Sequence, residues 1–234
     1  MQKVLYQKEV SCPVCNSKFK TSKVRLSQCR VERRDEDFCT YYEGENPLFY
    51  NVWVCPQCGY SALENSFYEL NAWQKANVGK HISTKWVKKS YGSKRGIKEA
   101  LECYKLALYC GQVIDEKDSL IASICLCLSW LYRMQGNTVQ ERKFMEHAIG
   151  FYTEAYQKET FPIGKMNEPT LMYLIGELYR RIDKCTEAVK WFNRVVRHPL
   201  RHETPAVEKM ARDQWHLASQ QRKENGEYNI SVEG

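Results

Sequence analysis

The C-terminal half of the chain repeats its apolar residues with the period of an α-helix. Over residues 94–224, apolar side chains recur at spacings of three and four, which places them on one face of a helix. Turn residues such as Gly136 and Pro162 separate the stripes. The first three stripes are Ile97, Ala100, Leu101, Tyr104, Ala107 and Leu108; Leu120, Ile121, Ile124, Leu128, Leu131 and Tyr132; and Phe144, Met145, Ala148, Ile149 and Tyr152. The pattern predicts a helical domain over residues 94–224.

One helix pair in this part matches the tetratricopeptide signature, in which small residues let two helices approach and aromatic residues fill the groove between repeats. The matching residues are Met172, Ile175, Gly176 and Tyr179 on the first helix, Ala188 and Phe192 on the second, and Pro199 after it. Cys125 to Tyr132 is a weaker copy of the first helix. Positions equivalent to Phe192 are spaced by 41 and 47 residues, so we expect an irregular array. A last helix from Pro205 would cover its end.

The first sixty residues have a different pattern, in which apolar and polar residues mix as in half-buried β-strands. Phe19, Thr21, Val24 and Leu26 stand among lysines and arginines, which indicates a strand. A second strand is predicted from Phe49 to Val54, after a cluster of turn residues at positions 43–47.

Two Cys-x-x-Cys pairs lie beside these strands. The four cysteines are Cys12, Cys15, Cys55 and Cys58. Four thiolates are the number that a tetrahedral structural zinc site needs, although four thiolates also suit iron. The 39 residues between the pairs exceed the usual spacing, so we expect an inserted strand or hairpin. A unit of this size buries too little apolar surface to be stable alone, and metal binding would supply the missing folding free energy.

The metal interpretation has alternatives. A Cys-x-x-Cys pair can be a redox centre, but that chemistry favours a first cysteine at a helix N-terminus, whereas strand-like sequence follows Cys15. Cys29 and Cys39 lie between the pairs and either approach the metal or pack as small apolar side chains.

Together these patterns predict an α+β fold that is mostly α. Residues 1–60 form a zinc-ribbon-like β unit, residues 61–93 a helical connector, residues 94–224 a tetratricopeptide-like helical array, and residues 225–234 a flexible tail. In the connector we expect a helix from Ala62 to Asn77, ended by Gly79, and a second helix from Ser83 to Tyr91.

Several short motifs resemble one bacterial family. They are Asp37-Phe38-Cys39, Asn46 to Tyr50, and Val54-Cys55-Pro56-Gln57-Cys58-Gly59-Tyr60, together with the first cysteine pair. The combination is similar to domain-of-unknown-function family 2225, and the likeness extends over most of the chain. The resemblance implies a bacterial cytoplasmic protein with a zinc-ribbon-like N-terminal part, and it implies no known activity.

Composition and charge narrow the setting and suggest one kind of partner. Cysteines in spaced pairs, with no apolar leader and no apolar run long enough for a membrane span, favour a reducing cytoplasm. The net charge of +7 is concentrated between residues 75 and 98, a run without acids. Its candidates for binding RNA or DNA are Lys75, Lys80, Lys85, Lys88, Lys89, Lys94 and Arg95, interleaved with Trp86 and Tyr91. The alternative is a solvated surface with Trp86 in the core.

The helical array offers a second candidate surface, because such arrays commonly bind peptides or proteins along their first helices. The candidate residues are Trp130, Arg133, Tyr173, Glu177, Arg180 and Arg181. Trp130 and Tyr173 alternatively belong to the core. No catalytic motif is present, so we expect a non-enzymatic interaction module that binds a protein or peptide, with nucleic-acid binding as the first alternative and a thiol oxidoreductase as the second.

Overall fold

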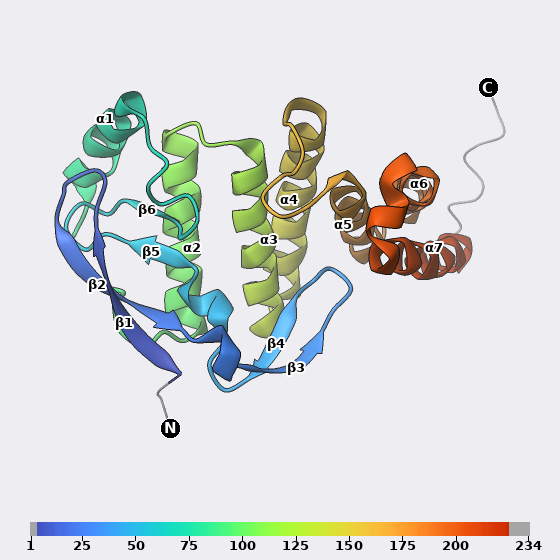
Figure 1. Ribbon diagram of the computed structural model, residues 1–234, viewed down its shortest axis with the longest axis horizontal. Coiled ribbons are helices and arrows are strands. Elements are labelled where there is room, and N and C mark those ends of the chain that lie inside the picture. Colours follow the sequence, from blue (N-terminus) through green and yellow to red (C-terminus); the bar gives the residue numbers. More distant parts are fainter. Residues whose placement is uncertain (1–3, 225–234) are drawn as a thin grey trace. The chain divides into compact units, whose positions relative to one another are not determined.

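The computed structural model describes residues 4–224, which form two compact units (Figure 1). Unit 1 comprises residues 1–35 and 39–144, and unit 2 comprises residues 36–38 and 145–234. Strand pairs occupy the N-terminal part and α-helices the rest, so the prediction of an α+β fold that is mostly α is confirmed. The boundaries expected at residues 60 and 93 both fall inside unit 1, and the predicted tail lies outside the described residues.

The strands of unit 1 form three separate antiparallel pairs. Strand β1 (Leu5–Ser11) pairs with β2 (Lys18–Val24), and β5 (Val52–Val54) pairs with β6 (Ser61–Leu63). Strand β2 coincides with the first predicted strand, whereas the pattern of polar residues in β1 gave no signal for it. The remaining pair is β3 (Arg30–Arg34) with β4 (Thr40–Glu43), which is the hairpin expected between the two cysteine pairs.

The predicted strand from Phe49 to Val54 is only half correct. Its first residues belong to the 3₁₀ turn η2 (Pro47–Tyr50), and the strand begins at Val52. Pro47 fixes a backbone angle that suits the first turn of a helix, and the Asn46 side chain accepts a hydrogen bond from the Leu48 N–H at 3.0 Å. This local capping prevails over the β-preference of the aromatic residues.

The predicted helix from Ala62 to Asn77 is wrong over its first half. Residues 61–63 form β6, and Phe67 packs in the core of unit 1 without being part of a helix. Helix α1 (Ala72–His81) begins only after Asn71, whose side chain accepts from the Gln74 N–H while Gln74 bonds back to Asn71. The helix continues through Gly79. The second predicted helix is reduced to the 3₁₀ turn η3 (Ser83–Lys85).

The hairpins carrying the cysteine pairs share one core with the helices of unit 1. Val10, Trp53 and Phe67 from the strand region pack with Val78 of α1 and with Ile114 after α2 (Ile97–Val113). Helix α3 (Asp118–Met134) follows, and α4 (Thr138–Lys158) contributes its residues up to Phe144 to this unit. The rings of Tyr132 and Phe144 stack with their centroids 5.5 Å apart.

A buried arginine links the strands of unit 1 to the start of α2. Arg95 is 2% exposed, and its guanidinium donates to the backbone carbonyls of Phe49, Val52 and Tyr91. It also donates to the Thr21 hydroxyl at 3.2 Å. These acceptors compensate a charge that would otherwise be costly to bury.

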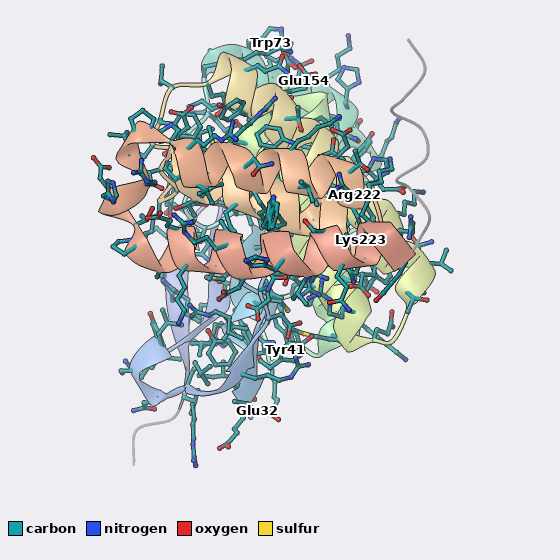
Figure 2. The ribbon with its side chains drawn as sticks, turned by 90° about the vertical axis from the view of Figure 1, so that its right-hand side faces the viewer. Glu32, Tyr41, Trp73, Glu154, Arg222 and Lys223 are labelled. Atoms are coloured by element: carbon teal, nitrogen blue, oxygen red, sulfur yellow. The ribbon has the colours of Figure 1, made fainter. Side chains whose placement is uncertain are left out.

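Among the described residues, unit 2 contains residues 36–38 and the end of α4, followed by three helices. These are α5 (Glu168–Arg181), α6 (Cys185–Arg197) and α7 (Pro205–Glu224), with the 3₁₀ turn η4 (Pro199–Glu203) before α7. Arg222 and Lys223 mark the last turn of α7 in Figure 2. Of the predicted tetratricopeptide residues, Met172 to Tyr179 lie on α5, and Ala188 and Phe192 lie on α6.

Helices α5 and α6 pack closely through Gly176. A Cβ atom at this position would lie 2.8 Å from Cε1 of Phe192 and 3.2 Å from Cβ of Trp191. The small residue therefore allows the aromatic side chain of α6 to lie against the backbone of α5. Across the described residues, no helix is long and apolar enough to span a membrane.

This close approach gives the first prediction. Gly176→Ala should destabilise unit 2 by about 1–3 kcal/mol, because the added methyl overpacks the contact with Phe192. Gly150→Ala is the matched control, since Gly150 is a helical glycine of the same unit with nothing within 4 Å of its Cβ position. That change should stabilise by about 0.5–1 kcal/mol. Urea unfolding of the variants measures both effects, and equal midpoints for the two would contradict the packing argument.

Candidate metal centre

The two cysteine pairs occupy equivalent turns in two hairpins. Cys12 and Cys15 lie in the turn between β1 and β2, and Cys55 and Cys58 lie in the turn between β5 and β6. In the first turn the Cys12 N–H donates to the Ser17 carbonyl at 2.9 Å. In the second the Cys55 N–H donates to the carbonyl five residues on, at 2.8 Å. The turns therefore have the same backbone hydrogen-bond pattern around their first cysteine.

Each turn closes through a residue with a left-handed backbone. Asn16 follows the first pair with a φ of 59°, and Gly59 follows the second with a φ of 75°. Their N–H groups donate to the carbonyls of Cys12 and Cys55, each at 2.9 Å. Glycine and asparagine are the residues that adopt this conformation at the lowest cost.

The equivalent turns bring the four sulfur atoms together. Cys12 Sγ lies 3.5 Å from Cys58 Sγ, and Cys15 Sγ lies 3.6 Å from Cys55 Sγ. All four sulfurs lie within 4.8 Å of one another. A tetrahedral zinc ion with ligands at 2.3 Å places sulfurs about 3.8 Å apart. The arrangement therefore fits a four-thiolate metal site and needs only a small contraction to close around an ion.

The site is enclosed on three of its four ligands. Cys12, Cys55 and Cys58 are buried, whereas Cys15 is exposed. The Ser17 hydroxyl lies 3.0 Å from Cys15 Sγ and 3.4 Å from Cys55 Sγ, so it can donate to either thiolate. Such contacts hold ligands in orientation. Neither pair stands at a helix N-terminus, the position that activates the first cysteine of a redox motif.

The mutual proximity of the thiols shifts their acidities in opposite directions. Hydrogen bonds from Cys12 and Cys58 hold the pKa of the Cys55 thiol far below its usual value. The hydrogen bond with Cys55 raises the pKa of Cys12 to about 12, and the hydrogen bond with Cys12 raises the pKa of Cys58. Like charges this close disfavour one another. A bound divalent cation would stabilise all four as thiolates.

The sequence did not reveal what covers the second turn. Trp86 lies against Gly59, where a Cβ would come within 2.6 Å of its ring, and its indole N–H donates to the Pro56 carbonyl at 3.0 Å. Trp86 is therefore held against the backbone of the turn, which limits its use as a partner for a nucleic-acid base.

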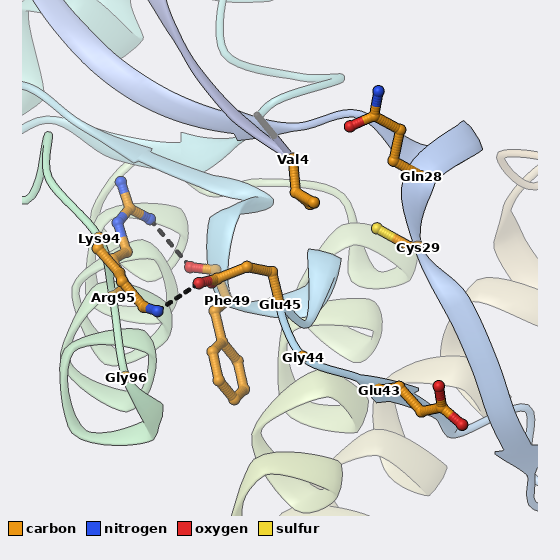
Figure 3. A pocket seen from close by; sticks show the side chains of 10 residues that line it. All are labelled: Val4, Gln28, Cys29, Glu43, Gly44, Glu45, Phe49, Lys94, Arg95 and Gly96. Atoms are coloured by element: carbon orange, nitrogen blue, oxygen red, sulfur yellow. Dashed lines mark hydrogen bonds and ion pairs between the residues drawn. The ribbon is translucent and has the colours of Figure 1, made fainter. Parts of the chain in front are cut away.

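Cys29 and Cys39 are not among the four clustered sulfurs. Cys39 is fully buried, and Cys29 Sγ contacts the Arg25 carbonyl at 3.6 Å. Cys29 lines a separate pocket of about 460 Å³, shown in Figure 3, and Lys94 and Glu45, which form an ion pair, are among its lining residues. Burial and the charge of Glu45 raise the pKa of the Cys29 thiol, so it remains protonated near neutral pH.

The seven basic candidates divide into three groups. Lys75, Lys80, Lys85 and Lys88 are exposed and have no acidic partner among the described residues. Lys89 pairs with Glu102 at 2.5 Å, and Lys94 pairs with Glu45. Arg95 is buried and holds backbone carbonyls, so its expected exposure to nucleic acid is wrong.

The six candidates for a partner surface also divide. Trp130 is half-buried on α3 in unit 1, and Arg133 of the same helix pairs with Asp35 and Glu141 at 2.9 and 2.6 Å. The structure brings the other four together on α5 in unit 2. They are Tyr173, Glu177, Arg180 and Arg181. Tyr173 and Glu177 are fully buried, so Tyr173 belongs to the core in keeping with the alternative stated for it.

The fold and the cysteine cluster define the class of protein. It is a mostly helical α+β protein with a candidate four-thiolate metal site in its N-terminal unit. The chain belongs to the family described as "Uncharacterized protein conserved in bacteria (DUF2225)", which matches residues 5–218. No curated protein and no solved structure matches the chain. The expected family membership is therefore confirmed.

The exposed ligand provides the sharpest test of the site. Cys15→Ser should remove bound metal and destabilise unit 1, because a hydroxyl is a poor replacement for a thiolate ligand. Cys29→Ser is the matched control outside the cluster and should keep wild-type metal content. Elemental analysis of anaerobically purified protein, with circular dichroism for folding, measures both. Equal metal content in Cys15→Ser and the wild type would contradict the site.

Proposed function

We propose that this chain is a non-enzymatic zinc-binding protein whose helical unit binds a protein or peptide. The observation that carries the metal part is the convergence of four sulfurs from two equivalent turns within 4.8 Å. Zinc suits a closed four-thiolate site with a structural role, and a rubredoxin-like iron would reveal itself by visible thiolate absorption. All eleven cysteines are free thiols, which supports a reducing cytoplasm as the setting.

The metal would join two hairpins that belong to separate sheets and that also contact each other through side chains, such as the ion pairs of Lys8 and Lys23 with Glu64. Strands β5 and β6 pair over only three residues, and no sheet joins them to β1 and β2. Structural zinc contributes on the order of 10 kcal/mol or more in zinc-finger peptides, enough to fix such short elements. The hairpins then present one core to α1 and α2.

The partner-binding part is supported by the character of α5. This helix combines a tetratricopeptide-like packing face, centred on Gly176, with a cationic edge formed by Arg180 and Arg181. A rigid helix with directed polar groups is well suited to hold a peptide.

The edge of α5 provides the test of partner binding. Arg181→Gln removes one charge while Glu177 keeps its other partner, Arg180, so unit 2 should stay folded. Affinity purification from the source organism, quantified by mass spectrometry, should show partners that are retained by the wild type and reduced at least fivefold for this variant. Lys190→Gln, an exposed lysine on α6, is the control. Identical partner lists for all three proteins would contradict binding through α5.

Single-stranded nucleic acid is a second candidate partner, because the excess positive charge of the chain lies in unit 1. Unit 1 has 22 lysines and arginines against 13 acids, whereas unit 2 has 13 against 15. On α1 the side chain of Trp73 is 57% exposed and projects outward in Figure 2. Lys80 lies on the same face, seven residues on, opposite the buried Val78. An exposed tryptophan beside unpaired cations suits base stacking with phosphate contact.

Neutralising the unpaired lysines tests the second candidate. Changing Lys75, Lys80, Lys85 and Lys88 together to Gln should weaken binding of a labelled poly-uridine oligonucleotide, and should reduce the dependence of log affinity on log salt by about 3 if each contacts a phosphate. The control changes four exposed lysines of unit 2, namely Lys165, Lys184, Lys209 and Lys223, to Gln. Equal weakening by both sets, or no binding by the wild type at low salt, would exclude this surface.

A further inference from the structure

A short acidic segment already lies on the α5 surface. Glu36, Asp37 and Phe38 belong to unit 2, although the rest of that unit begins only at residue 145. The three residues form a turn, and Asp37 is fully buried. They come from a part of the sequence that is distant from α5, so the contact is tertiary.

Interactions of several kinds hold this segment. The Tyr173 hydroxyl donates to the Glu36 backbone carbonyl at 2.9 Å. Arg181 Nη2 lies 3.8 Å from Asp37 Oδ1, which makes a charge contact. The rings of Phe38 and Tyr173 pack with their centroids 5.6 Å apart and tilted by 48°. A carbonyl, a carboxylate and an aromatic ring are thus each met by a matching group of α5.

The receiving groups are fixed in position by other residues of the same helix. Glu177 is fully buried and accepts from Arg180 Nε and Nη2 at 2.8 and 2.7 Å and from Arg181 Nε at 2.7 Å. Its two cationic neighbours leave one positive charge uncompensated, and Asp37 supplies the missing negative charge. Planar guanidinium groups held in this way are ordered before a carboxylate binds.

The segment adopts an unfavourable backbone to make these contacts. Phe38 has a φ of 69°, a conformation that is sterically unfavourable for a bulky L-residue. Its packing against Tyr173 provides a compensating contact. The surrounding contacts must offset the strain of this conformation, which indicates that the side chain of Phe38 occupies a specific packing position.

We propose that the α5 surface formed by Tyr173, Glu177, Arg180 and Arg181 is a binding site for an acidic–aromatic turn, Asp followed by Phe, and that residues 36–38 are its resident ligand. This inference rests on the proposed function and names the chemistry of its partner. A partner protein with an Asp-Phe turn would compete with the resident segment. Because residues 36–38 are part of the same chain, their effective concentration at the site is high. An external ligand has to compete with them and therefore binds the wild type weakly.

The site is expected to survive loss of its resident ligand. When Asp37 is removed, Arg181 keeps its 2.7 Å contact with Glu177. Glu177 keeps both of its arginine partners, and the positive charge that Asp37 had offset lies on Arg181, whose side chain is 21% exposed, so the helix remains compatible with folding. The double variant Asp37→Ala/Phe38→Ala therefore frees the surface in the full chain.

The experiment uses a labelled synthetic peptide of residues 32–40 carrying Cys39→Ser, with binding followed by fluorescence anisotropy. The freed variant should bind this peptide at least about tenfold more tightly than the wild type, because its surface is no longer occupied. A peptide with Asp37→Asn and Phe38→Ala should not bind. Adding Arg181→Gln to the freed variant should weaken binding by about tenfold or more, with reduced sensitivity to salt.

A matched control comes from β3. Val31→Ala/Glu32→Ala also removes one apolar and one acidic side chain, both exposed, and should bind the peptide as weakly as the wild type. If the freed variant is folded by circular dichroism and retains its metal content but does not bind the peptide, the inference is wrong and residues 36–38 are ordinary packing. If the freed variant is unfolded, the resident segment is required for folding and the inference is equally wrong.

The two proposals fail in distinguishable ways. Absence of peptide binding together with partners that still copurify with the wild type and are lost with Arg181→Gln overturns only the acidic–aromatic specificity. Peptide binding that depends on Arg181 supports the inference whatever copurifies. Absence of both removes the α5 surface as a binding site altogether.

Discussion

The convergence of four sulfurs is the constraint on which the N-terminal unit depends. The two hairpins that carry them are short, lie far apart in the sequence, and are joined by no common sheet. Their cysteine turns follow the same course, each closed by a left-handed residue after its second cysteine, and the hairpins also contact each other through a shared core and through ion pairs of Lys8 and Lys23 with Glu64. The hydrophobic core then extends from these turns to α1 and α2, so the orientation of the helices is linked to the geometry of the cysteines.

The sequence predicted the parts of the fold that depend on local spacing. Cysteine spacing singled out the four cysteines whose sulfurs cluster, and helical periodicity located α2 to α7 together with the glycine at the contact between α5 and α6. It failed over residues 61–71, where the spacing of Leu63, Phe67 and Leu70 imitates a helix, and over residues 83–91, where only the turn η3 forms. In the structure Phe67 is a core residue of the hairpins, and it is buried against Tyr60, Trp53 and the more distant Phe19, contacts that helical spacing does not report.

Charged side chains proved harder to interpret than apolar ones. The same basic run supplies exposed lysines, lysines paired with acids, and Arg95, which is buried among backbone carbonyls. These residues have the same charge in the sequence. Whether a carboxylate or a carbonyl oxygen lies close enough to pair with each of them depends on the tertiary structure. The arginines of α5 show the same dependence, since their partners are Glu177 four residues or fewer away and Asp37 in a distant turn.

The four sulfurs of the cysteine cluster differ in their access to solvent, so reagents approach the cluster from one side. Three of the thiols lie in the interior, and only Cys15 faces solvent, with the Ser17 hydroxyl beside it. A competing chelator or an oxidant in solution meets Cys15 first, whereas the other three sulfurs can be reached only after the turn opens. If the cluster holds an ion, a single hairpin turn would govern how fast that ion exchanges, whereas all four thiolates would set its affinity.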